Sequence, residues 1–80
     1  MRYILFIKEE CSFCVKAVQL LEEKKLNYKL VVFDSSQEMI LQEIKEAHDW
    51  ATVPMVFYRN GSLIKFIGGY TDLLEEIKDG

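Results

Sequence analysis

The chain has 80 residues, of which 50% are hydrophobic and 12% aromatic, a composition typical of a folded domain and unlike that of a disordered segment. Ten basic and thirteen acidic residues give a formal net charge of −3, without the basic cluster that a nucleic-acid-binding protein needs. We therefore expect a single domain over residues 1–80, with a small core, because a chain this short buries only about 60% of its unfolded surface.

The first predicted element is a strand, "RYILFIK", which is nearly continuous in apolar and aromatic character. Its apolar run is shorter than the roughly 7–15 residues of a signal-peptide core. It is also far shorter than the about 20 residues that span a bilayer. The sequence therefore predicts a soluble, cytoplasmic protein that does not associate with membranes, in a compartment where structural disulfides are uncommon.

A helix is predicted next, from Ser12 to Lys25, because apolar residues recur there at helical spacing. The stripe consists of Cys14, Ala17, Val18 and Leu21. A second strand, "NYKLVVF", follows. Ser35 and Glu38 then form a capping-box pattern, which predicts a second helix that fades around His48. The predicted buried stripe of that helix consists of Ile40, Ile44 and Ala47.

The last third of the chain predicts a hairpin and a short helix. "VPMVFYR" and "LIKFI" are strands on either side of Asn60-Gly61, a dipeptide that favours a tight hairpin turn. Asp72, with Glu75, is expected to cap a final helix. Its apolar residues are Leu73, Leu74 and Ile77.

These elements predict an α/β fold in the order β-α-β-α-β-β-α, with a mixed four-stranded sheet flanked by helices. The crossover helix makes the first two strands parallel, and the hairpin makes the last two antiparallel.

The only cysteines, Cys11 and Cys14, allow three interpretations. A disulfide staple over four residues would stabilise the fold by only about 2 kcal/mol in the chain-entropy model. A structural zinc site needs four ligands, whereas the chain offers this pair and one histidine, His48. A reactive thiol pair beside a β-α-β pattern is the specific interpretation.

The helix start distinguishes the two thiols. Unpaired N–H groups and the positive end of the helix dipole stabilise a thiolate at Cys11, and a dipole worth up to about 2 kcal/mol outweighs the exposed Glu9 and Glu10, which salt screens. We therefore predict that Cys11 is the nucleophile with the lower thiol pKa and that Cys14, on the buried stripe, is the resolving thiol.

Two further segments have both a plain and a functional interpretation. In "TVP", Pro54 sits at a strand start, where proline is tolerated; alternatively, a cis bond after Val53 would leave that residue's backbone free to pair with a peptide. "GGYTD" is either a loop before a capped helix or a clamp for a carboxylate and an amine. The residues alone leave both alternatives open.

The segments "KEECSFC", "TVP" and "GGYTD" occur in the order and spacing of glutaredoxins, which have the thioredoxin fold. The resemblance runs from Tyr3 to about Ile77. It implies a dithiol glutaredoxin, an enzyme of electron transport and cell redox homeostasis, in which Cys11 attacks and Cys14 resolves. It also implies glutathione as electron donor and no required metal.

The same resemblance implies the binding site and the partners. The positions expected to bind glutathione are Lys8, Phe13, Thr52, Val53, Pro54, Gly69, Thr71 and Asp72. The expected partners are glutathionylated proteins and disulfide-containing proteins such as metabolic reductases, and we expect a monomer.

The sequence departs from the family pattern at several positions. Ser12 replaces the usual proline between the cysteines, and Leu41, with Gln42 beside it, falls where a polar residue often helps to bind glutathione. The longer hairpin looks closer to thioredoxin. Trp50 is either an aromatic that contacts a partner or a half-buried residue, and we favour the second interpretation. The alternatives are therefore a thioredoxin-like protein recycled by thioredoxin reductase, or a dimer that holds an iron–sulfur cluster through Cys11 and glutathione, which Ser12 keeps open.

Overall fold

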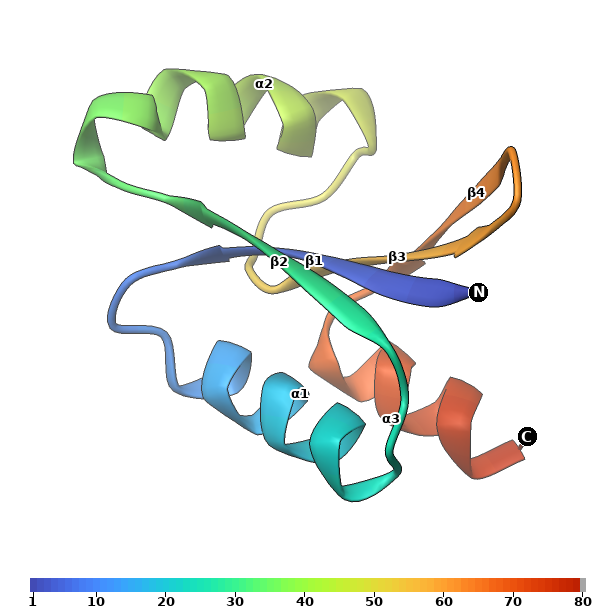
Figure 1. Cartoon of the computed structure of the whole chain (residues 1–80). Coiled ribbons are helices and arrows are strands. Elements are labelled where there is room, and N and C mark those ends of the chain that lie inside the picture. Colours follow the sequence, from blue (N-terminus) through green and yellow to red (C-terminus); the bar gives the residue numbers. More distant parts are fainter. Residues whose placement is uncertain (80) are drawn as a thin grey trace.

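The computed structural model describes residues 1–79 and has the predicted order of elements (Figure 1). They are β1 (Arg2–Lys8), α1 (Ser12–Glu23), β2 (Tyr28–Phe33), the 3-10 turn η1 (Ser35–Gln37), α2 (Glu38–Ala47), β3 (Met55–Asn60), β4 (Leu63–Gly68) and α3 (Tyr70–Asp79). The predicted β-α-β-α-β-β-α arrangement is confirmed. Within residues 1–79, no helix combines the length and the apolar character needed to cross a bilayer.

The four strands form one mixed sheet in the order β2-β1-β3-β4. β1 pairs with β2 in parallel, and β1–β3 and β3–β4 are antiparallel, as the crossover helix and the hairpin predict. Figure 1 shows α2 over one face of the sheet and α1 with α3 over the other. The carboxyl end of β1 leads directly into the loop before α1, so this end of the sheet carries the cysteines.

A hydrophobic layer covers each face of the sheet. On the face of α1 and α3, the buried residues are Leu5, Ala17, Leu20, Leu21, Val56 and Leu73. On the face of α2, they are Phe33, Leu41, Met55 and Phe57. The central strand β1 contributes to both layers, because successive side chains of a strand point to opposite faces.

Helix α2 meets the sheet through a different stripe from the predicted one. Leu41 is 1% exposed and Ile44 is partly buried, whereas Ile40 is 55% exposed and Ala47 is also exposed. The prediction of Ile40 and Ala47 as buried residues is therefore wrong. Successive helix residues are turned by about 100°, so a helix that buries Leu41 and Ile44 turns Ile40 towards solvent.

The predicted capping box of Ser35 and Glu38 is also wrong, because it lies one residue earlier. The Asp34 carboxylate accepts from the Ser36 backbone N–H at 2.9 Å, and the Gln37 side-chain oxygen accepts from the Asp34 N–H at 3.2 Å. Asp and Gln fill the same two roles as Ser and Glu. The box thus starts η1, and α2 continues from it.

Two boundaries differ from the prediction by one or two residues: the end of α1 and the position of the hairpin loop. α1 ends at Glu23, because Lys25 has a φ of 55° and has left the helix. In the hairpin, the two loop residues are Gly61 and Ser62, since Asn60 still pairs with Leu63. Gly61, at φ 63°, takes the first loop position, where a type II′ turn requires positive φ.

Candidate active site

Cys11 occupies the N-cap position of α1. The chain leaves β1 at Lys8, turns through Glu9 and Glu10, and reaches Cys11 in an extended conformation (φ −120°, ψ 108°). Its sulfur accepts the backbone N–H of Cys14 at 3.2 Å, the position where a Ser or Asp oxygen normally caps a helix. The reactive atom of the predicted nucleophile therefore also satisfies an orphan donor of the first helical turn.

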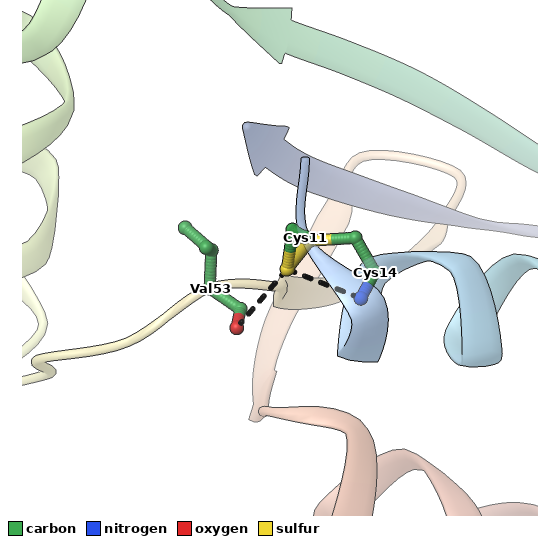
Figure 2. Close-up of a disulfide and its surroundings, with 3 residues drawn as sticks. All are labelled: Cys11, Cys14 and Val53. Atoms are coloured by element: carbon green, nitrogen blue, oxygen red, sulfur yellow. Dashed lines mark hydrogen bonds between the residues drawn. A yellow bond between two sulfur atoms is a disulfide. The ribbon is translucent and has the colours of Figure 1, made fainter. Parts of the chain in front are cut away.

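The two cysteines form a disulfide (Figure 2), and they differ in their exposure to solvent. Cys14 is 2% exposed, on the buried stripe of α1, whereas Cys11 is partly exposed. This difference matches the predicted arrangement of an accessible first thiol and a buried second one. Any incoming sulfur can reach Cys11 from solvent but cannot reach Cys14.

Cys11 meets the proline loop across the active site. Its Sγ lies 3.8 Å from the carbonyl oxygen of Val53 (Figure 2). In the disulfide this is a contact without a proton, and a reduced thiol in the same place would donate to that carbonyl. The Val53–Pro54 peptide bond is cis, the form on which the functional interpretation of this segment depends; the pairing of Val53 with a peptide stays a prediction.

A groove of about 280 Å³ opens beside this loop. It is lined by Phe13, Trp50, Thr52, Val53, Pro54, Gly69, Tyr70, Thr71 and Asp72. The fold thus gathers residues from the start of α1, the proline loop and the start of α3, as the resemblance implies. All the predicted glutathione-binding residues line this groove, with the exception of Lys8.

Lys8 lies elsewhere and already has a carboxylate partner. Its Nζ is 3.2 Å from Glu38 Oε1, at the start of α2, and it does not line the groove of the proline loop. Leu41, which falls near a family binding position, is in the core at 1% exposure and offers no polar group to a ligand.

Asp72 is tied to the glycine pair before α3. The helix begins at Tyr70, so Asp72 is its third residue. The prediction that Asp72 is the N-cap is therefore wrong. The carboxylate Oδ2 reaches back to accept the Gly69 N–H at 3.0 Å, which is half of a capping box. A side chain at Gly68, whose φ is 129°, would overlap that carboxylate, so any larger residue there would displace Asp72 from its bond to Gly69.

Sequence reasoning missed two aromatic residues of the groove. Tyr70 lies in the "GGYTD" segment and packs against Phe13, with ring centroids 6.1 Å apart. Trp50 is half-buried, as interpreted from the sequence, and yet its ring also lines the groove. Its position four residues before the only proline was the one signal available for it.

The part of the chain that the structure describes has no cluster of three or more histidine, cysteine or acidic side chains placed to hold a metal ion. His48 follows the last turn of α2 and packs against the rings of Phe57 and Phe66, with centroid separations of 5.1 and 5.0 Å. It is therefore a helix-end histidine, as the sequence indicated.

The sheet order and the cysteine pair at the start of the first helix define a thioredoxin-like protein with a Cys-x-x-Cys dithiol motif. The sequence model of the family Glutaredoxin matches residues 4–64, more than half of the chain. The chain therefore belongs to the glutaredoxin family.

Curated relatives agree with this assignment. Glutaredoxin 1 of Rickettsia prowazekii is 32% identical over 78 residues, which are 96% of this chain and 78% of that protein. Mitochondrial glutaredoxin-2 of Bos taurus is 33% identical over 79 residues, or 96% of this chain and 48% of that protein. The chain spans about half the length of the mitochondrial glutaredoxin-2 proteins that it matches.

Solved structures of two glutaredoxins have the same fold. Glutaredoxin 1 from Francisella tularensis, complexed with cacodylate, superposes with a TM-score of 0.75 at 22% identity and covers 98% of this chain and 93% of that chain. Glutaredoxin from Brucella melitensis gives a TM-score of 0.68 at 22% identity and covers 100% of this chain and 82% of that chain. The predicted thioredoxin-like fold is confirmed.

Proposed function

We propose that this protein is a glutathione-dependent thiol–disulfide oxidoreductase with Cys11 as nucleophile and Cys14 as resolving thiol. One observation carries the proposal: the accessible Cys11 sulfur caps α1 and contacts Val53, at the edge of the groove beside the proline loop. Membership of the glutaredoxin family supports the thiol–disulfide chemistry.

In the proposed first step, the Cys11 thiolate attacks the glutathione sulfur of a glutathionylated protein. A bond forms between Cys11 and glutathione, the original disulfide breaks, and the protein leaves as a thiolate that takes a proton from water. The Cys14 N–H at 3.2 Å stabilises negative charge on the Cys11 sulfur before the attack. The thiolate of a second glutathione then attacks the glutathione sulfur of this mixed disulfide. Glutathione disulfide is released, and the Cys11 thiolate is restored.

Protein disulfides follow a second route. Cys11 attacks one sulfur of the substrate disulfide, and the Cys14 thiolate then attacks the Cys11 sulfur of the mixed disulfide. The substrate gains two electrons and leaves as a dithiol, and the enzyme is left with the Cys11–Cys14 disulfide, the form in Figure 2. Two glutathione molecules reduce that disulfide again.

The groove has the groups that a γ-linked tripeptide needs. Val53 offers its backbone beside the reacting sulfur, Thr71 and the backbone N–H groups at the start of α3 suit a carboxylate, and the free oxygen of Asp72 suits an ammonium group. Phe13 and Tyr70 provide an apolar wall. Lys8 would contribute only after leaving Glu38.

The substrate classes that follow are glutathionylated proteins and disulfide-containing reductases of metabolism, in a cytoplasmic setting where glutathione is abundant. A coupled assay tests the proposal. The purified protein should reduce the mixed disulfide of glutathione and 2-mercaptoethanol with glutathione and glutathione reductase, but not with thioredoxin reductase alone.

Two variants separate the roles of the cysteines. Cys11→Ser should lower both activities to background, because no other accessible thiol replaces it. Cys14→Ser should keep activity on the glutathione mixed disulfide and lose it on a protein disulfide. An active Cys11→Ser variant, or turnover supported by thioredoxin reductase alone, would contradict the proposal.

A further inference from the structure

A second and larger groove opens on the other side of the cysteine pair. Its volume is about 660 Å³, and it runs between α1 and the edge strand β2. Both Cys11 and Cys14 line it. Its apolar lining consists of Ile7, Val15, Val18 and Leu30.

Two of these apolar residues are left uncovered by the fold. Leu30 of β2 pairs in register with Leu5 of β1, so both face the α1 side of the sheet. α1 covers Leu5 completely, whereas Leu30 is 36% exposed, and Val15 on α1 is 55% exposed. The helix lies over the centre of the sheet and leaves a strip between itself and β2 open to a ligand.

The polar rim of this groove is acidic. Glu10 and Glu22 lie along it, and the one cation among its lining residues, Lys8, is paired with Glu38 at 3.2 Å. The Glu22 carboxylate also accepts the Tyr28 hydroxyl at 2.6 Å, which holds it at the rim. An occupant with an apolar side chain and a nearby positive charge therefore complements the groove.

The outer edge of β2 adds a main-chain component. The sheet order places β2 at one end, so the backbone groups on its outer side have no strand partner within residues 1–79. An extended peptide can pair with such an edge and place alternate side chains in adjoining pockets.

We propose that this groove binds the polypeptide that flanks the reactive cysteine of a protein substrate, in extended form, with an apolar residue and then a basic residue near that cysteine. The inference rests on the proposed function and deepens it. A glutathionylated protein has two arms at its disulfide, and a groove lies on each side of Cys11. The α1–β2 groove contains Cys11 itself and would take the protein, and the proline-loop groove, which would take the tripeptide, is reached through Val53, 3.8 Å from the Cys11 sulfur. Because both cysteines line this groove, a polypeptide in it lies next to the disulfide under attack, and its cysteine sulfur is the leaving group of the first step.

The first test uses the full chain and two synthetic peptides, each glutathionylated at a single cysteine. One peptide has Leu and Arg after the cysteine, and the other has Ser and Glu. We expect the unmodified protein to reduce the first with a kcat/KM at least five times higher, and this preference to weaken as salt is added. If the unmodified protein reduces the two peptides with equal kcat/KM, the proposal is overturned, and no variant is needed to show it.

The second test removes the exposed apolar surface. The double variant Val15→Ser and Leu30→Ser should lower kcat/KM for the Leu-Arg peptide by about tenfold, mainly through KM, as expected from the apolar area lost. Leu63→Ser is the matched control, because Leu63 is 73% exposed on β4, at the opposite edge of the sheet. Its kcat/KM should stay within twofold, and equal losses in both proteins would overturn the proposal.

A third variant tests the charge without touching the apolar lining. Glu22→Gln keeps an acceptor for Tyr28 and should reduce the preference for the basic peptide by about threefold. An unchanged preference would overturn the basic part of the proposal, even if the double variant fails to fold.

Two controls separate this inference from its premise. All variants should reduce the mixed disulfide of glutathione and 2-mercaptoethanol at the unmodified rate, because that substrate has no polypeptide arm. If the unmodified protein fails on it, the proposed function itself is wrong. Sedimentation should give the same mass for the unmodified protein and for all variants. If the unmodified protein is a dimer and the double variant is a monomer, the groove binds a second copy of the chain, and the proposal is overturned.

Discussion

Cys11 and Cys14 are three residues apart, yet the fold gives them different environments. The helical period places Cys14 under α1, next to the core, and leaves Cys11 at the helix start, where its sulfur caps the first turn. Serine at position 12 fits this geometry as well as proline, because it is the first helical residue and its N–H needs no helical partner. The asymmetry of the pair is thus a property of helix geometry.

Gly68 is the residue on which the start of α3 depends. Its φ of 129° disfavours any side chain, and a Cβ there would overlap the Asp72 carboxylate. We expect Gly68→Ala to lower the free energy of unfolding by about 2–4 kcal/mol, from backbone strain and the lost Asp72 contact. Urea unfolding measures this loss.

Gly61→Ala is the matched control for that measurement. Gly61 also has positive φ, at 63°, but a Cβ there meets no atom within 4 Å. Its substitution should cost only about 1–2 kcal/mol, the price of the left-handed conformation alone. Equal losses at the two positions would show that the Asp72 contact does not matter.

Among the elements, the capped turn η1 makes stability depend on pH. The Ser36 hydroxyl and then the Ser36 backbone N–H donate to Asp34 and lower the pKa of its carboxyl group. The pKa of Asp34 in the folded protein lies below the unfolded value of about 4. The ionised Asp34 cap therefore makes its full contribution to the free energy of unfolding above about pH 4. It is lost as the pH falls through the folded pKa.

We therefore expect Asp34→Ala to destabilise the protein at pH 7, and the difference from the unmodified protein to shrink below pH 4. Urea unfolding at pH 7 and pH 3 measures both values. Glu43→Ala, at an exposed position of the following helix α2, is the control and should have little effect at either pH. A difference that persists unchanged at pH 3 would show that the carboxylate charge plays no part in the cap.

For the whole molecule, stability rests on a small core around the central strand. Leu5, in the central strand β1, is fully buried beneath the helices α1 and α3. Leu5→Ala should lower the free energy of unfolding by about 2–5 kcal/mol, a large share of the roughly 5–15 kcal/mol available to a protein domain. Leu63→Ala, at 73% exposure, should change it by less than about 0.5 kcal/mol.

Both variants can be measured by urea unfolding monitored through Trp50, the only tryptophan. Leu5 lines neither groove, so the folded fraction of Leu5→Ala should keep its activity on the small mixed disulfide. A stable Leu5→Ala protein would contradict the view that the centre of the sheet supports the site.

Local sequence patterns predicted most elements of this fold. They failed where two neighbouring residues suit the same role equally well and only tertiary packing determines which of them fills it. The strand at 2–8 and the helix from Ser12 follow from hydrophobic period and from polar boundaries, and both are present. The stripe of α2 was predicted one residue off, because Ile40 and Leu41 are equally apolar and only contact with the sheet selects Leu41. The capping box was displaced for the same kind of reason, since Asp34 and Ser35 are both good caps.

The sequence alone determined the order of the elements and the position of the cysteines at a helix start, because helical period, turn residues and caps act over a few neighbouring residues. Tertiary structure decided the rest: the cis form before Pro54, the contact of Cys11 with Val53, the pairing of Lys8 with Glu38, and the two grooves. Each of these joins segments far apart in the chain, and their meeting depends on how helices and strands pack together.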